Sequence, residues 1–244
     1  MAAKVYTFHI SYAGLEDRIW RDVEVSSNYS LDKLGYMVLA LFETMAYHPF
    51  EFYYNGKRYK MPKRRRTTKN SKSIATLSQL ALKIGDKIQM NYDFGTTQTF
   101  WLELVSVEDM QRGRGNHYPY IIDGAGHGII DDCHYTELAK LIEKIDQNGN
   151  SDDPILFDGR IIYWDFYRFD ISSKNYFLKT EIMMIAEGGS PFFGRSLICW
   201  PEIDEGNQAL ELTEELLKEY EVYGRLDDWK HEILETEGVR KFKS

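Results

Sequence analysis

The 244-residue chain contains little cysteine, little proline and no long hydrophobic run. Its two cysteines, Cys133 and Cys199, exclude a disulfide framework and are typical of a reducing cytoplasm, which is the location we expect. No apolar run approaches the roughly 20 residues of a membrane helix, and the N-terminus has no signal-peptide core, so we predict no membrane association. With 43% hydrophobic residues, the composition excludes collagen-like and disordered classes.

Acidic residues outnumber basic ones, but the charges are unevenly distributed. The net charge is 30 − 38 = −8, yet the stretch from Lys57 to Lys72 holds nine basic residues and no acid, which leaves −17 on the rest. Because an acidic body repels polyanions, nucleic acid or an acidic protein face would bind at this stretch. The alternative is a solvated loop, which the polar, aperiodic composition of the stretch also fits. The candidate contacts are Lys57, Arg58, Lys60, Lys63, Arg64, Arg65, Arg66, Lys69 and Lys72.

The first hundred residues alternate between strand and helix patterns. An apolar stripe at three- and four-residue steps predicts a helix from Ser30 to Met45, which His48-Pro49 ends because the residue before proline avoids the helical region. This order of elements predicts an α+β fold, in which one helix crosses a β-grasp-like mixed sheet. Period-two patterns predict strands over residues 5–12, 19–25, 50–54, 87–94 and 99–107, and a short helix is expected over 74–82.

Two motifs stand out between residues 84 and 133. The first runs from Ile84 through Tyr-Asp-Phe-Gly95 into a Leu-Glu-Leu strand; the second is Tyr118–Gly124 followed by Asp131-Asp132-Cys133. In this order they resemble the motifs of the plasmid pRiA4b ORF-3-like family over about residues 3–145. The resemblance implies a β-grasp-like α+β core and a mobile-element setting in bacteria or archaea, but no established activity. The matching residues are Tyr92, Asp93, Phe94, Gly95, Asp123, Gly124, Asp131, Asp132 and Cys133.

The chain departs from that family pattern at several chemically important positions. After Asp-Phe-Gly the family usually has Asp, Trp and His, where this chain has Thr96, Gln98 and Phe100. Where the family usually has Cys-Pro-Pro-Glu-Asp-Cys, residues 128–133 keep only the second cysteine, Cys133. If the family uses those groups chemically, most of them are lost here, which favours a non-catalytic or divergent member.

Four zinc-competent side chains lie within 18 residues: His117, His127, Cys133 and His134. Imidazole and thiolate ligate zinc and other divalent metals, although no pair has CxxC or HxxxH spacing. The alternative is a glycine-rich surface loop that caps a helix near residues 135–145, with Asp131 or Asp132 as its N-terminal carboxylate. No other cofactor is predicted.

A polar segment, Asp146–Asp153, separates the family-like part from the rest. It resembles a calcium loop, but its glycine comes too early and Phe157 replaces the required glutamate, so we interpret it as a linker. The predicted domains are residues 1–146 and 155–244, the second being an α/β extension that packs on the first. There, residues 161–169 and 176–185 have high strand propensity, and helices are predicted over 211–220 and 226–241.

No catalytic residue can be identified from these patterns. The leading hypothesis is a non-enzymatic binding or accessory protein of mobile-element origin that contacts nucleic acid through Lys57–Lys72. One alternative is a metal-dependent enzyme or metal-stabilised domain centred on His117–His134. A protein–protein interaction module is the other.

Overall fold

The computed structural model describes residues 3–60, 75–148, 155–157, 160–162, 164, 166–187 and 198–199. The chain divides into two compact units. The first unit comprises Met1–Asn148 and Phe166–Arg195, and the second comprises Gly149–Asp165 and Ser196–Ser244. In the described part of the chain, no helix is long and apolar enough to cross a membrane.

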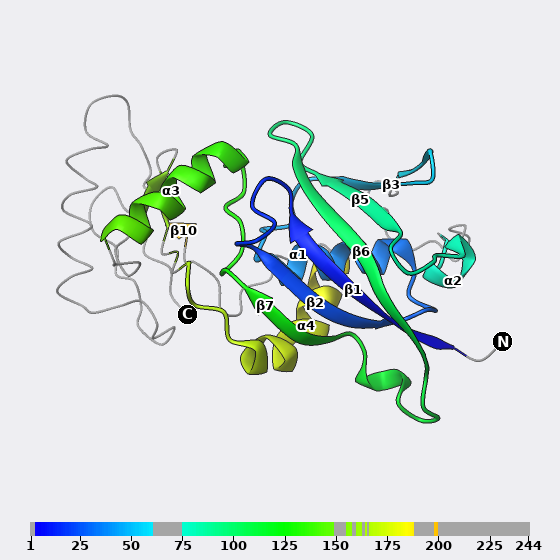
Figure 1. Ribbon diagram of the computed structural model, residues 1–244. Coiled ribbons are helices and arrows are strands. Elements are labelled where there is room, and N and C mark those ends of the chain that lie inside the picture. The colour runs from blue at the N-terminus through cyan, green and yellow to red at the C-terminus, as the bar shows by residue number, and fades with distance from the viewer. Residues whose placement is uncertain are drawn as a thin grey trace. The chain divides into compact units, whose positions relative to one another are not determined.

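The first unit is built on a seven-stranded sheet with the order β4-β3-β5-β6-β1-β2-β7 (Figure 1). Every pairing in it is antiparallel, because β1–β2, β3–β4 and β5–β6 are hairpins and β6 returns against β1. The α+β class is confirmed, the predicted mixed sheet is wrong, and the β-grasp arrangement is not confirmed. The strands are β1 (Lys4–Tyr12), β2 (Trp20–Ser26), β3 (Phe50–Tyr54), β4 (Lys57–Lys60), β5 (Lys87–Tyr92), β6 (Gln98–Asp109) and β7 (Tyr120–Ala125).

Helices α1 and α4 lie on one face of this sheet (Figure 1). The backbone of α1 comes very close to β3, since a Cβ added at Gly35 would lie 2.0 Å from the ring of Phe50. The side chains between α1 and the sheet form a buried core that includes Phe8, Phe52 and Phe100. The helices of the first unit are α1 (Leu31–Leu41), α2 (Leu77–Leu80), α3 (Tyr135–Asn148) and α4 (Ile171–Ala186), with a 3-10 turn, η1, at Gly115–His117.

Helix α1 ends at Leu41, before the predicted end at Met45. Glu43 and Ala46 adopt left-handed backbone conformations, with φ of 58° and 57°, which stop the helix. The N–H of Met45 donates to the carboxylate of Asp131 instead of a helical carbonyl. A tertiary hydrogen bond therefore takes the place of the last helical turn, and the proline is not what ends the helix.

The segment predicted as a strand over residues 176–185 forms helix α4, so that prediction is wrong. Asp170 caps the helix by accepting from the N–H groups of Ser172 and Ser173. Its buried positions recur at three- and four-residue steps, which outweigh the strand propensity of the aromatic and branched residues. These buried residues are Lys174, Leu178, Glu181, Ile182 and Ile185.

A buried ion-pair network joins α4 to the end of α1. The ammonium of Lys174 lies 2.5 Å from Glu43 and 2.8 Å from Glu181, and its side chain is 6% exposed. Nearby, the buried guanidinium of Arg21 donates to four backbone carbonyls, including those of Ala125 and His127. The network fixes the start of the segment that leads to His48.

The second unit contains a three-stranded antiparallel sheet with the order β10-β9-β8. Its strands are β8 (Ile155–Phe157), β9 (Arg160–Ile162) and β10 (Ile198–Cys199). The strand predicted over residues 161–169 is thus shorter and begins one residue earlier. The helices predicted over 211–220 and 226–241 lie outside the described residues.

Candidate functional site

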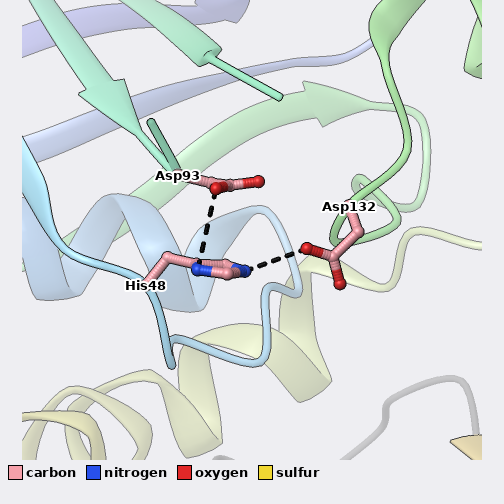
Figure 2. Close-up of side chains that lie close together, drawn as sticks. All are labelled: His48, Asp93 and Asp132. Atoms are coloured by element: carbon pink, nitrogen blue, oxygen red, sulfur yellow. Dashed lines mark hydrogen bonds and ion pairs between the residues drawn. The ribbon is translucent and has the colours of Figure 1, made fainter. Parts of the chain in front are cut away.

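Three potential metal-ligating side chains from distant parts of the sequence meet in the first unit: His48, Asp93 and Asp132 (Figure 2). The imidazole lies between the two carboxylates, with Nδ1 3.6 Å from Oδ1 of Asp93 and Nε2 3.0 Å from Oδ1 of Asp132. One donor atom of each residue lies within 4.8 Å of the others. The Asp93 side chain is 5% exposed, whereas those of His48 and Asp132 are 27% and 35% exposed, so the cluster has a buried and a solvent-facing side.

Each of the three residues lies in a connection. His48 belongs to the segment between α1 and β3, Asp93 directly follows β5, and Asp132 lies between β7 and α3. Asp93 and Asp132 have left-handed backbones, with φ of 52° and 64°. Aspartate tolerates this region better than most residues, but such conformations are uncommon and are found preferentially at functional sites.

The carboxylate of Asp93 is held by the turn that it begins. It accepts from the N–H of Gly95 at 3.0 Å and from the hydroxyl of Thr96. Its own N–H donates to the carbonyl of Pro49, one residue after His48. These bonds fix the buried carboxylate beside the imidazole without any ligand.

Asp131 stabilises the site from the side of the core. Its carboxylate accepts from the phenol of Tyr92 and from the N–H of Met45, both at 2.6 Å, and it is almost fully buried. Burial raises the pKa of Tyr92, and the neighbouring negative charge of Asp131 adds to this effect, so the phenol stays a hydrogen-bond donor. Asp131 thereby ties together the segments that carry Asp93, His48 and Asp132.

The approach of the segment 126–134 to the end of α1 depends on Gly128. A Cβ added there would lie 2.7 Å from the carbonyl oxygen of Phe42, to which the N–H of Ile129 donates. Residues 127–131 are buried, so the predicted surface loop is wrong. The predicted helix cap at Asp131 or Asp132 is also wrong, because both carboxylates bind other segments and His134 begins the hydrogen bonding of α3.

The cluster has the charge and the donor atoms of a divalent-cation site. The two carboxylates supply negative charge, and both carboxylate oxygen and imidazole nitrogen bind zinc. In a tetrahedral site, ligand atoms about 2.0–2.1 Å from zinc lie about 3.4 Å apart. The donors of His48, Asp93 and Asp132 already approach this separation. A metal bound through one nitrogen requires the donors to move closer together, which the partly exposed Asp132 can do more readily than the buried Asp93.

The four residues predicted as metal ligands are not gathered into such a cluster. His117 stacks on Tyr120, and His134 bonds with the hydroxyl of Thr136. His127 is buried and contacts the carbonyl of Arg168, and burial lowers its pKa. Cys133 is a buried thiol 3.7 Å from the carbonyl oxygen of His134. Each side chain therefore has its own protein partner.

The basic stretch is described only at its start. Lys57, Arg58 and Lys60 belong to β4, an edge strand of the sheet, and are exposed. The Arg58 guanidinium pairs at 2.6 Å with the buried carboxylate of Glu51. The predicted contacts that lie outside the described residues are Lys63, Arg64, Arg65, Arg66, Lys69 and Lys72.

The family-motif residues fall into two groups. Asp93 and Asp132 belong to the cluster, and Tyr92 and Asp131 support it from the core. Gly95 donates its N–H to Asp93, whereas Phe94 is 49% exposed beside it.

The other motif residues serve packing or the sheet. A Cβ added at Gly124 would lie 2.6 Å from the ring of Phe169. Asp123 is exposed on β7 opposite Asp22, and Cys133 is buried next to Asp132.

The positions where this chain departs from the family pattern adjoin the site. Thr96 donates its hydroxyl to Asp93, and Gln98 donates to the carbonyl of Cys133 at 2.8 Å. Phe100 is fully buried against Phe42. Thr96 therefore stabilises the turn that follows β5, and Gln98 joins β6 to the segment that carries Asp132.

The sequence gives no direct signal for His48. The sequence pattern marks His48 only as part of a helix-ending His-Pro pair, and no spacing relates residue 48 to residues 93 and 132. The two family motifs contain Asp93 and Asp132. Their common partner, His48, becomes visible only once the three segments are folded together.

One family model matches most of the chain, and one solved structure shares its fold. The family model described as plasmid pRiA4b ORF-3-like protein matches residues 4–173. The crystal structure of a protein of unknown function, MM3350, from Methanosarcina mazei Go1 is similar in fold, with a TM-score of 0.52 and 19% sequence identity over 70% of this chain and 98% of that one. A search of curated proteins finds no match. The chain thus belongs to the plasmid pRiA4b ORF-3-like family.

Proposed function

We propose that the protein binds a divalent metal ion, with zinc as the best match, through His48, Asp93 and Asp132. The observation that carries the proposal is the convergence of one imidazole and two carboxylates from three separate segments within 4.8 Å. The buried Asp93 would hold the ion from the core side. The partly exposed His48 and Asp132 would be the other two protein ligands. With three protein ligands, a zinc ion keeps a position for water or a substrate oxygen, which is the arrangement of catalytic zinc sites.

The metal proposal predicts a site-specific loss of affinity. Purified without chelator, the wild-type protein is expected to carry up to one zinc per chain, measured by elemental analysis and by competition with a chromogenic chelator. His48→Gln and Asp132→Asn each remove a metal ligand. Removal of a residue that only supports a ligand lowers metal affinity about 10- to 100-fold, so we expect zinc affinity to fall by more than this in both variants.

His9 and Asp22 provide a matched control. They form an imidazole–carboxylate pair at 2.7 Å with similar exposure, on the sheet and away from the cluster. His9→Gln should bind zinc like the wild type. Absence of zinc binding by the wild type, or equal losses in His9→Gln and His48→Gln, would contradict the proposal.

A second candidate function is contact with nucleic acid through Lys57–Lys72, in the mobile-element setting that the family resemblance implies. It is favoured by the place of Lys57 and Lys60, which are exposed on an edge strand. Six more basic residues follow within the next twelve positions of the sequence. A local excess of positive charge on an acidic protein directs polyanions to this edge.

The nucleic-acid proposal predicts strongly salt-dependent binding. The triple variant Arg64→Ala, Arg65→Ala, Arg66→Ala should bind labelled oligonucleotides more weakly, and the log–log dependence of affinity on salt should lose about 2 in slope. Fluorescence anisotropy over a salt series measures both effects. A control with the same charge change is Lys33→Ala, Lys140→Ala, Lys144→Ala, at exposed positions of α1 and α3. Equal binding by the two triple variants would refute a role for the basic stretch.

A further inference from the structure

The face of the sheet opposite α1 carries a straight row of side chains across five strands. Tyr53 on β3 pairs with Gln89 on β5, Gln89 with Trp101 on β6, Trp101 with Ser11 on β1, and Ser11 with Trp20 on β2. The row therefore alternates aromatic and polar residues. Residues directly opposite one another in a ladder point to the same face, so the three rings share one surface.

This surface is opposite the core. The alternate residues of the same strands, including Phe52, Met90 and Leu102, are fully buried, whereas Tyr53, Trp101 and Trp20 are half-buried. Among the elements that the structure describes, α1 and α4 both lie behind the sheet in the view of Figure 1. Neighbouring strands are about 4.8 Å apart, so successive aromatic rings of the row lie about 10 Å from one another.

One central acid of this face is neutralised by a lysine on the same face, since Glu103 pairs with Lys87 at 2.9 Å. Asp22 contacts the imidazole of His9 at 2.7 Å. At the β4 end, Glu51 pairs with Arg58 at 2.6 Å, and Lys60 lies directly opposite Glu51. The β4 edge thus has a positive excess, which is complementary to a polyanion.

We propose that single-stranded nucleic acid binds across this face, with bases stacked on Tyr53 and Trp101 and with phosphates at the β4 edge beside Lys60. The proposal rests on the second candidate function and extends it from charge to base contact. Aromatic side chains on an open sheet are established stacking platforms for unpaired bases. Gln89, which lies partly exposed between Tyr53 and Trp101, offers hydrogen bonds to base edges, whereas Ser11 is buried between Trp101 and Trp20.

The chemistry of the face favours a single strand over a duplex. Bases in a duplex are stacked on one another and cannot lie on the rings, whereas an unpaired strand presents its base faces. Glu24 and Asp123 on β2 and β7 limit the platform at its far end, because carboxylates repel phosphates. The occupied length is therefore short, about two or three bases on the row of rings.

The test measures affinity of the full-length protein for labelled dT12 and U12 and for a 12-base-pair duplex. Trp101→Leu and Tyr53→Leu should each weaken single-strand binding at least fivefold, since stacking on one side chain contributes about that factor or more. Trp101→Phe keeps a ring and should stay within about threefold of the wild type. Tyr176→Leu is the matched control, because Tyr176 is an 80% exposed aromatic on α4.

The outcomes separate this inference from the basic-stretch proposal. Loss in both leucine variants, retention in Trp101→Phe and in Tyr176→Leu, and weaker duplex binding support it, whether DNA or RNA binds better. If the Arg64–Arg66 variant weakens binding but both leucine variants bind like the wild type, the platform is refuted and the electrostatic contact stands. If the wild type binds none of the three probes, both proposals fail. Tyr53→Leu and Trp101→Phe keep the test decisive should Trp101→Leu unfold.

Discussion

Replacing Lys174 with methionine is expected to lower the free energy of unfolding by about 3–5 kcal/mol. The Lys174 ammonium is the cation between the carboxylates of Glu43 and Glu181, whose side chains are 9% and 0% exposed. Its loss breaks both buried ion pairs, and removing one member of a buried pair is very unfavourable for the charge that stays buried. Denaturant unfolding at neutral pH measures the effect.

Two further variants test whether charge is the cause. Lys33→Met changes an exposed lysine on α1 and should alter stability by less than about 0.5 kcal/mol. Adding Glu43→Gln and Glu181→Gln to Lys174→Met also removes the charges of the two carboxylates and should restore much of the lost stability. A loss below about 1 kcal/mol for Lys174→Met would show that the network contributes little.

The second large effect is expected at Asp131. Asp131→Leu leaves the N–H of Met45 and the hydroxyl of Tyr92 without their acceptor in a buried place. Each unsatisfied group costs about 1–3 kcal/mol, so the free energy of unfolding should fall by about 2–6 kcal/mol. Tyr92→Phe removes the hydroxyl together with its need for an acceptor, and it should cost about 1 kcal/mol.

Asp131 also connects stability with the proposed metal site. Asp131→Asn keeps the shape of the side chain and is expected to fold, but it should weaken zinc binding about 10- to 100-fold, as loss of a supporting residue does. At an exposed turn position, Asp17→Leu is the control for stability and Asp17→Asn is the control for zinc affinity. Stability of Asp131→Leu equal to that of Asp17→Leu would refute the anchoring role. Unchanged zinc affinity of Asp131→Asn would restrict Asp131 to stability alone.

The strands of the first unit were largely predictable, because their pattern is local. Period-two alternation in β1 and β2 and the Asn-Gly turn between β3 and β4 arise from residues that are neighbours in sequence. The basic stretch was predicted as a loop throughout, yet residues 57–60 form β4, since pairing with β3 supplies hydrogen bonds that composition does not report.

Helix α4 shows where local preference fails. Its aromatic and branched residues favour a strand when taken alone, but the buried positions from Lys174 to Ile185 follow the helical period. Two of those positions, Lys174 and Glu181, are charged, so a hydrophobic pattern does not reveal them. Their burial is possible because they pair with each other and with Glu43, a contact 131 residues away in the sequence.

The amino-acid sequence by itself determined the α+β class, the strands around the first family motif and the membership of Asp93 and Asp132 in the two motifs. Only the tertiary structure decided that His48 is their partner. Periodicity reports which side of an element is buried, whereas a site built from three connections depends on how those connections meet. Here that meeting depends on Asp131, which binds Met45 and Tyr92, and on Gly128, which allows the backbone to touch the end of α1.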